Sequence, residues 1–196
     1  MKKIAVIIVA AGASSRMKRP KQLLSLRETT LLGHAIEQAE ASQAEEVFVV
    51  LGANAERIKT SLGFREFSIV ENKHWEEGIG VSISTGVNAV TSTKDFDAVL
   101  LMLGDQPLID SVYLDQMIAE FNKDPSTMVA TKYPKSNGVP ALFPKKYFPQ
   151  LMLLGGDTGA KSLLNDGSSP VTAIDAGNKI LDIDTPEDYR RIDDFL

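Results

Sequence analysis

The sequence predicts an α/β fold in which helices cover both faces of a mostly parallel sheet. Short apolar runs alternate along the chain with stretches whose apolar residues recur at helical spacing. The run at residues 99–103 contains no polar side chain, which is expected of a central strand buried on both faces. A chain of 196 residues has room for one domain with a sizeable core, so we expect residues 1–196 to fold as a single unit.

Strands and helices are expected in alternation. Strands are predicted at residues 4–9, 46–51, 67–70, 97–103, 127–131, 141–143 and 171–174. Helices are predicted at residues 31–41, 55–62, 80–90, 112–122, 145–153, 159–164 and 186–195. The stretch 132–137, which contains Pro134, is the most loop-like interior segment and is where we expect a hairpin-like return.

The composition excludes several kinds of chemistry and of partner. The chain has no cysteine, which removes disulfides, thiolate metal sites and cysteine nucleophiles. Its net charge of −5 argues against a nucleic-acid partner, and no apolar run approaches the roughly 18 residues of a membrane helix. The basic start imitates a signal peptide, but the run at 4–9 is β-branched and leads into a glycine-containing loop. We therefore interpret that run as a buried strand and expect a cytoplasmic protein.

The loop that follows the first predicted strand has the composition of a phosphate site. Ligands of open parallel sheets bind at the carboxyl ends of strands, where this loop begins. Ala10, Ala11 and Gly12 let backbone amides approach a phosphate, and Arg16 and Lys21 add positive charge. The pattern is neither a dinucleotide-binding nor a Walker sequence. A tight strand exit explains the glycine alone and a solvated turn explains the charges alone, but neither explains both.

Two aspartates are candidate metal ligands. Asp105 follows the most apolar strand, and two central strands of a parallel sheet would bring it near the first loop, where it can hold Mg²⁺ together with substrate phosphates. Considered alone, Asp105 is more simply an aspartate in a turn. Further along, Thr185 before Pro186 is a good helix start, and this capping role leaves Asp184 as a candidate second ligand.

The two histidines are expected to be structural. His34 lies on a predicted helix of apolar periodicity and His74 lies beside Trp75. Neither has a serine or cysteine nucleophile motif nearby. The chemistry is therefore expected to depend on carboxylates, lysine, arginine and backbone amides.

Taken together, these segments resemble the MobA/MocA group of nucleotidyltransferases. The amino-terminal signature of that group, Leu-Ala-Ala-Gly-x-Ser-x-Arg-Met-Gly-x-x-Lys, is similar to residues 9–21, with Lys18 where glycine is usual. This departure concerns the conformation of the loop and leaves its cations in place. Five further segments resemble the MocA-like branch of this group in their order and spacing. They are residues 72–78 with Ser82, 104–107, 138–143, 155–161 and 182–188. The resemblance covers nearly the whole chain.

The resemblance implies a GT-A-like nucleotide-diphospho-sugar transferase fold, a Rossmann-related three-layer sandwich with a mostly parallel mixed sheet. It also implies transfer of CMP from CTP to molybdopterin, the organic part of the molybdenum cofactor, with release of pyrophosphate. A molybdoenzyme that receives the product is the further partner it implies. Neither nucleic acid nor membrane is expected as a partner.

The same resemblance assigns roles to individual residues. The triphosphate would be held by the backbone of Ala10, Ala11 and Gly12 with Arg16 and Lys21, and Mg²⁺ by Asp105 and Asp184. Arg16, Lys21 and Asp105 would be the catalytic residues. The base and ribose pocket would be lined by Asn72, Gly78 and Ser82, and the acceptor would be faced by Asp157 and Gly159.

The sequence leaves three alternatives open. The guanylyl-transferring branch uses GTP on the same acceptor, and the choice of base depends on contacts that spacing does not reveal. A sugar phosphate or other alcohol phosphate is a more distant acceptor, because related folds serve many acceptors. The third alternative is a catalytically silent carrier of the molybdenum cofactor. The joint presence of four charged candidate residues argues against a carrier: Arg16, Lys21, Asp105 and Asp184.

Overall fold

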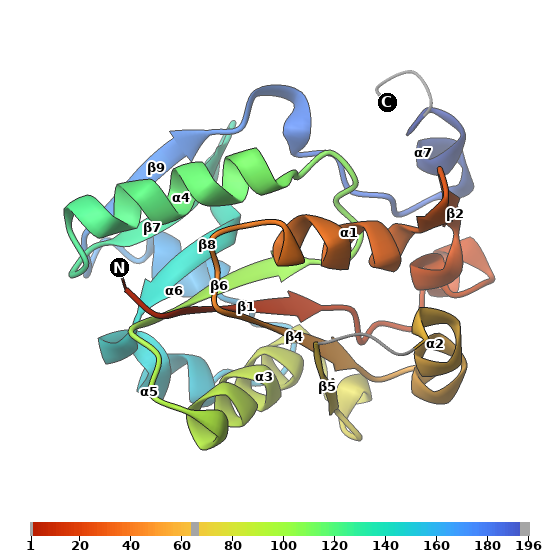
Figure 1. Ribbon diagram of the computed structural model, residues 1–196, viewed down its shortest axis with the longest axis horizontal. Helices are drawn as coiled ribbons and strands as arrows, with labels where there is room; N and C mark the ends of the chain where they lie inside the picture. The colour runs from red at the N-terminus through yellow and green to blue at the C-terminus, as the bar shows by residue number, and fades with distance from the viewer. Residues whose placement is uncertain (1, 64–66, 193–196) are drawn as a thin grey trace.

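A computed structural model describes residues 2–63 and 67–192 of the chain. The strands are β1 (Ile4–Val9), β2 (Ser25–Leu26), β3 (Thr29–Thr30), β4 (Glu46–Leu51), β5 (Ser68–Glu71), β6 (Ala98–Leu103), β7 (Met128–Tyr133), β8 (Ser136–Pro144) and β9 (Val171–Asp175). Seven of them form one sheet in the order β5-β4-β1-β6-β8-β7-β9 (Figure 1), and β2 pairs with β3 separately. Within the described residues β8 is antiparallel to both neighbours and the other pairs of the large sheet are parallel. The predicted mostly parallel mixed sheet is confirmed.

Helices cover both faces of this sheet (Figure 1). The first apolar cluster contains α1 (Leu31–Glu40), α2 (Ala55–Leu62) and α4 (Ser111–Lys123), and the second contains α3 (Ile79–Thr93), α5 (Phe148–Met152) and α6 (Lys161–Asn165). Alternate residues of β1 enter the two clusters, with Val6 and Ile8 in the first and Ala5 and Ile7 in the second. The sheet is therefore the middle layer of a three-layer sandwich. No helix in the described residues is long and apolar enough to span a bilayer.

Most predicted elements are present with shifts of one to three residues at their ends, but β8 begins five residues before the predicted strand at 141–143, and β2 and β3 were not predicted. The strands at 4–9 and 46–51 and the helix at 55–62 have the predicted bounds. The remaining described turns of helix are short 3₁₀ segments at Ser15–Met17, Lys21–Leu23, Trp75–Glu77, Lys145–Tyr147 and Gly177–Lys179. The predicted helix at 145–153 is one such 3₁₀ turn followed by α5.

The expectation of a loop at 132–137 is wrong, although the expected return is there. Lys132 pairs with Asn137 and Tyr133 pairs with Ser136, so the ladder between β7 and β8 closes almost up to the turn. The turn itself is confined to residues 134–135. A proline with a fixed φ suits a tight turn and does not require a long loop around it.

The last helix begins as predicted. The Thr185 side chain accepts a hydrogen bond from the Asp188 N–H, and the Asp188 carboxylate accepts from the Thr185 N–H, which completes a capping box before Pro186. The helix, α7 (Pro186–Arg190), is shorter than the predicted 186–195, and residues 193–195 of that prediction lie outside the described residues.

The segment before α7 folds back onto the loop that follows β1. Ile183 is fully buried in a small cluster with Met17 and Leu24, and its N–H donates to the carbonyl of Asp105 at 3.0 Å. These contacts bring Asp184, near the end of the sequence, to the carboxyl end of β6.

Candidate active site

The loop after β1 is held open by one buried glutamine. Gln22 is 3% exposed, and its Nε2 donates to the carbonyls of Ala10 at 2.8 Å and Gly12 at 2.9 Å. With the carbonyls fixed inward, the N–H groups of residues 11–13 donate no hydrogen bond to any part of the chain that the structure describes. Free amides in succession are the groups that bind phosphate oxygens.

Two residues of this loop have left-handed backbone conformations. Ser14 has φ 57° and Lys18 has φ 55°. The Ser14 hydroxyl accepts from the Lys21 N–H at 3.1 Å and donates to Gln22 at 3.3 Å, which fixes its place. Lys18 stands where the resembled signature has glycine, and its conformation explains that glycine, because a left-handed backbone strains residues that carry a Cβ.

Lys21 joins the two predicted metal ligands. Its Nζ contacts Asp105 Oδ2 and donates to Asp184 Oδ1 at 2.9 Å. Arg16 Nη2 lies 3.0 Å from the other oxygen of Asp184. Only 18% of the Lys21 side chain is exposed, whereas Arg16 is 67% exposed at the rim. The structure thus brings together four predicted site residues from the beginning, middle and end of the chain.

The charges of this cluster shift its pKa values in opposite directions. Burial works to lower the pKa of Lys21, but the charge of Asp105 and the hydrogen bonds to both aspartates outweigh it, so the pKa is raised. Burial likewise works to raise the pKa of Asp184, and the hydrogen bond and charge of Lys21, aided by Arg16, lower it below its usual range. Lys21 and Asp184 are therefore charged at neutral pH.

A third aspartate lies behind the pair. Asp182 accepts from Gln106 Nε2 at 2.9 Å, and burial, followed by the charge of Asp105, raises its pKa. Gln106 also donates to the hydroxyl of Tyr133 at 3.0 Å. Burial and then the charge of Asp182 raise the pKa of Tyr133 to about 12, so that phenol is neutral.

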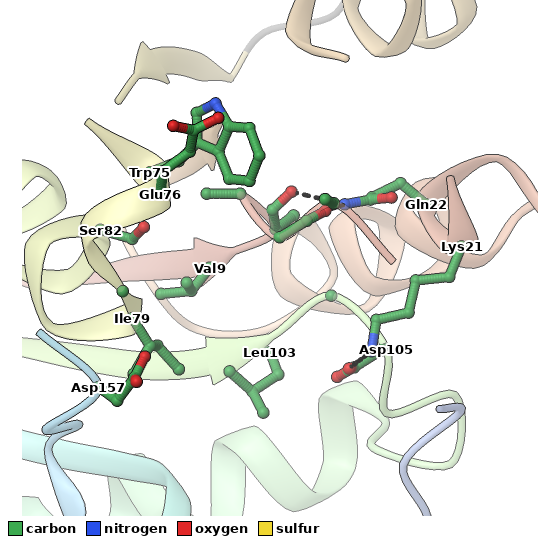
Figure 2. A pocket seen from close by; sticks show the side chains of 16 residues that line it. Val9, Lys21, Gln22, Trp75, Glu76, Ile79, Ser82, Leu103, Asp105 and Asp157 are labelled. Atoms are coloured by element: carbon green, nitrogen blue, oxygen red, sulfur yellow. Dashed lines mark hydrogen bonds and ion pairs between the residues drawn. The ribbon is translucent and has the colours of Figure 1, made fainter. Parts of the chain in front are cut away.

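A pocket of about 360 Å³, here called the central pocket, opens beside this cluster at the carboxyl ends of β1 and β6. Figure 2 shows Lys21 and Asp105 at one end of it, with Trp75, Ser82 and Asp157 toward the other. It is lined by eight of the predicted site residues: Ala10, Ala11, Gly12, Lys21, Gly78, Ser82, Asp105 and Asp157. Arg16 and Asp184 are not in its lining. Asp184 contacts the lining residue Lys21, and Arg16 contacts Asp184.

A second pocket of about 210 Å³, the side pocket, adjoins the first. The two share the side chains of Val9, Ile79 and Leu103 as a common wall. Gly159, predicted to face the acceptor together with Asp157, lies in the side pocket, so those two residues face different pockets. The polar residues of the side pocket are Tyr133, Asn137, Lys161 and Asp182.

The residues expected around the base and ribose have different surroundings. Asn72 is buried behind the pocket wall, where its Nδ2 donates to the Ser82 hydroxyl at 3.0 Å and its Oδ1 accepts from the His74 N–H at 2.9 Å. Gly78 has φ 108°, and a Cβ there would lie 2.8 Å from the Asp157 nitrogen. Gly78 and Ser82 thus line the central pocket. Asn72 is outside its lining and holds the Ser82 side chain and the His74 backbone in position.

The two histidines lie outside both pockets. His34 Nε2 donates to the carbonyl of Pro107 at 3.1 Å, and burial lowers its pKa. His74 pairs with Glu77 at 3.0 Å on the surface. His34 fastens α1 to the loop that follows β6.

Four residues of the site were not anticipated from the sequence. Gln22 stands next to the predicted Lys21, and Gln106 and Asp182 each lie within two residues of a predicted aspartate. Gln106 and Asp182 lie inside the motifs at 104–107 and 182–188, and Gln22 directly follows the motif at 9–21, so those motifs were the signal that could have identified these three. Trp75 lies inside the motif at 72–78, and an aromatic residue between two pocket residues was the signal that could have identified it.

The pair of aspartates fits a divalent cation. Asp105 Oδ1 is buried and accepts no hydrogen bond within the described chain, so this carboxylate oxygen has no partner. Within the same residues there is no group of three or more histidine and acidic side chains placed to hold a metal. Two carboxylates are nonetheless the protein ligands that Mg²⁺ takes when substrate phosphates complete its shell.

Comparison with known proteins identifies the family. A family model described as the MobA-like NTP transferase domain matches residues 6–171. The nicotine blue oxidoreductase of Paenarthrobacter nicotinovorans is 29% identical over 95% of this chain and 94% of its own. The purine catabolism protein PucB of Bacillus subtilis is 28% identical over 93% and 92%.

A solved structure agrees over the whole fold. The crystal structure of Rv0371c from Mycobacterium tuberculosis has a TM-score of 0.85 with 29% identity, covering 97% of both chains. A second structure of Rv0371c is a complex with manganese, with a TM-score of 0.81 and 26% identity. The sandwich is thus that of the GT-A-like nucleotidyltransferases, and the chain belongs to the MobA-like NTP transferase family.

Proposed function

We propose that the protein transfers CMP from CTP to molybdopterin and releases pyrophosphate. The observation that carries this proposal is the position of Lys21 between Asp105 and Asp184, beside a pocket faced by the free amides of residues 11–13. Fixed cations and amides recognise the triphosphate, and paired carboxylates suit the cation that accompanies it. Membership of the family supports the reaction class, and the resemblance to the MocA-like branch supports the choice of CTP and of the acceptor.

The chain's own groups do most of the electrostatic work. The amides of residues 11–13 and the ammonium of Lys21 bind the phosphates, and Arg16 at the rim adds charge where pyrophosphate leaves. Donors fixed in advance and partly shielded from water stabilise a transition state better than mobile water does. Gln22 keeps those amides in place, which makes it a positioning residue.

Asp105 and Asp184 are the residues that would hold Mg²⁺. The unpartnered oxygen of Asp105 supports a cation at this place, and the solved complex of Rv0371c with manganese supports a divalent cation as the kind of ion. A bound divalent cation supplies positive charge that offsets the charge of the phosphates. The raised pKa of Lys21 and the lowered pKa of Asp184 keep the cluster ionised for this purpose.

The acceptor is assigned to the side pocket and to the wall it shares with the central pocket. Its floor is largely apolar, which suits a flat heterocycle, and Lys161 and Asn137 offer polar contacts. Asp157 in the central pocket and Gly159 in the side pocket lie on one connected loop, which supports an acceptor that spans both.

The reaction is an exchange at the α-phosphorus. An oxygen of the acceptor's terminal phosphate forms a bond to that phosphorus, the bond to the bridging oxygen of the β-phosphate breaks, and pyrophosphate leaves with the electron pair. The attacking phosphate is already anionic at neutral pH, so no general base is required. Catalysis is then positioning and charge stabilisation by Lys21, Arg16 and the loop amides.

Pyrophosphate release tests the proposal. The purified protein is incubated with Mg²⁺, molybdenum cofactor released from a molybdoenzyme, and either CTP or GTP. We expect release with CTP in preference to GTP. Release with GTP alone would replace the cytidylyl reaction by the guanylyl one. Tight binding of the molybdenum cofactor with no turnover of either nucleotide would mean a carrier and would contradict a transferase.

A further inference from the structure

We infer that Trp75 and Glu76 form the nucleobase subsite of the central pocket. The indole stacks on the base, and the carboxylate accepts a hydrogen bond from an exocyclic amino group of that base. This inference rests on the proposed function, because it takes the pocket to hold a nucleoside triphosphate. It assigns to these two residues both the binding of the base and the preference for a base that carries an amino group.

The direction of the bound nucleotide follows from the charges of the pocket. Lys21 and Asp105 lie at one end, next to the free amides of the loop after β1, and that end takes phosphates. Figure 2 shows Trp75 and Glu76 away from Lys21, on the turn that precedes α3, and both line the pocket. A nucleotide whose phosphates lie at Lys21 therefore extends its base toward Trp75.

The position of Trp75 is fixed by a glycine at the end of β4. A Cβ on Gly52 would overlap the Cβ of Trp75, and it would lie 2.7 Å from the Trp75 Cγ and 2.8 Å from the carbonyl oxygen of Ala11. The indole thus packs against bare backbone beside the first loop. The turn that carries it is held from beneath by Asn72, whose Oδ1 accepts from the His74 N–H.

Trp75 is held in place yet remains accessible. It is neither buried nor fully exposed, and its side chain contributes to the pocket surface. An ordered aromatic ring facing a pocket is a stacking platform, and it serves any base because every base has a π-face. Stacking therefore gives affinity and leaves the choice of base to another group.

Glu76 is the group that can make this choice. It lines the pocket and has no hydrogen-bond or ion-pair partner among the described residues, whereas the neighbouring Glu77 is paired with His74 at 3.0 Å. A carboxylate accepts from the amino group of cytosine and is repelled by the carbonyl oxygen that uracil has in the same place. CTP and UTP differ at this group and at the neighbouring N3, which is an acceptor in cytosine and carries a hydrogen in uracil, and they are otherwise identical, which makes them the appropriate pair of probes.

Fluorescence tests the stacking directly, because Trp75 is the only tryptophan of the chain. We expect CTP with Mg²⁺ to quench its emission, and inorganic tripolyphosphate to compete with CTP for the site while quenching far less. If CTP raises the Tm of the protein and leaves the emission unchanged, the base lies elsewhere and the inference is overturned.

Substitutions separate the two residues. Trp75→Leu raises the KM for CTP by about 5- to 100-fold, the range expected for loss of an aromatic partner of one base, and leaves kcat within a few-fold. Trp75→Phe restores most of the affinity because it keeps a stacking face. A wild-type KM in Trp75→Leu, with circular dichroism confirming the fold, contradicts the assignment.

Glu76→Gln tests the choice of base. In the wild type kcat/KM for CTP exceeds that for UTP by about 10- to 100-fold, and in Glu76→Gln the ratio falls toward one, because an amide can turn to serve either base. Glu77→Gln on the same turn is the matched control and keeps the wild-type ratio. An unchanged ratio in Glu76→Gln overturns the role of that residue.

Failure of this inference is distinguishable from failure of the proposed function. If the wild type releases pyrophosphate from CTP and the Trp75 and Glu76 variants behave like it, the subsite is wrong and the reaction stands. If the wild type neither binds nor cleaves any nucleoside triphosphate, both are overturned.

Discussion

The two ends of the central pocket are built by different means. At the end where we propose that phosphates bind, here called the phosphate end, side chains of opposite charge from distant segments meet. Ion pairs join Lys21 to Asp105 and Asp184, and the backbone hydrogen bond from Ile183 to Asp105 brings Asp184 close. At the other end, shape dominates, because Gly52 and the turn before α3 leave room for one another and for the indole. At the first end we expect charge to select the group that binds, whereas at the second end close backbone packing determines the position of the Trp75 ring.

This difference determines how each end responds to substitution. Removing a charge at the phosphate end affects the transition state more than the fold, because the developing charge there loses its partner. Adding an atom at the packed end moves backbone against backbone and affects the fold first. The expected effects below run from the largest to the smallest.

The largest effect is expected at the phosphate end. Lys21→Ala lowers kcat for pyrophosphate release by about 10²–10³, the size of losing one fixed electrostatic group. Arg16→Ala is the comparison, and because its side chain is 67% exposed at the rim we expect a loss of less than about tenfold. Equal losses of kcat in the two variants would show that Lys21 contributes no more to catalysis than a cation at the rim does.

A pair of glycines compares the two ends directly. Gly78→Ala places a Cβ against the backbone of residues 156–157 at a φ of 108°, a strain of about 1–3 kcal/mol. In a domain of this size each kcal/mol corresponds to about 2–4 °C in Tm. In Gly12→Ala no atom lies within 4 Å of the new Cβ, so we expect the wild-type Tm. The KM for CTP rises, because the Cβ occupies space through which a phosphate would approach the loop amides. Thermal unfolding and kinetics on both variants check this, and reversed outcomes would contradict it.

Divalent cations should rescue the stability of one variant. Lys21→Ala leaves the largely buried Asp105 without its cation, which costs about 1–3 kcal/mol after allowance for the exposure of Asp184. Mg²⁺ or Mn²⁺ then binds the two carboxylates and raises the Tm of this variant more than that of the wild type. Differential scanning fluorimetry with and without metal measures this, and an equal rise in both proteins would mean that the carboxylates hold no metal.

The smallest effect is expected at Asp182. Its pKa is raised, so the folded protein holds this proton more tightly than the unfolded chain does. The ionised carboxylate therefore costs stability at neutral pH, and that cost vanishes as the pH falls through the raised pKa. Asp182→Asn keeps an oxygen for Gln106 and raises the Tm at pH 7 in metal-free buffer, with a smaller gain at pH 4. The same gain at both pH values would exclude the electrostatic cause.

The phosphate end was largely predictable from the sequence, and the packed end was not. Arg16, Lys21 and Asp105 carry their chemistry in their side chains, and apolar periodicity places them after buried strands. The approach of Asp184 required long-range packing of Ile183 that no local pattern encodes. No sequence pattern marks Gly52, because its role is to leave space for the side chain of Trp75, which lies more than twenty residues further along the chain.

The fold shows the same division. The strands at 4–9 and 46–51 were predicted to the residue, because runs buried on both faces have a clear pattern. The stretch 132–137 was predicted as a loop because Pro134 dominates it, whereas the cross-strand ladder between β7 and β8 extends to both sides of the turn. Pairing with a neighbouring strand is a tertiary property that local composition does not contain.

The central claim is that Asp105 and Asp184 serve one cation, and a double-mutant cycle on kcat/KM for pyrophosphate release from CTP tests it most directly. Asp105→Asn and Asp184→Asn are compared singly and together. If the two carboxylates act as a unit, the double variant is about as slow as the slower single variant, because the first substitution already removes the shared site. Losses that multiply in the double variant, or a wild-type rate in either single variant, would contradict the account.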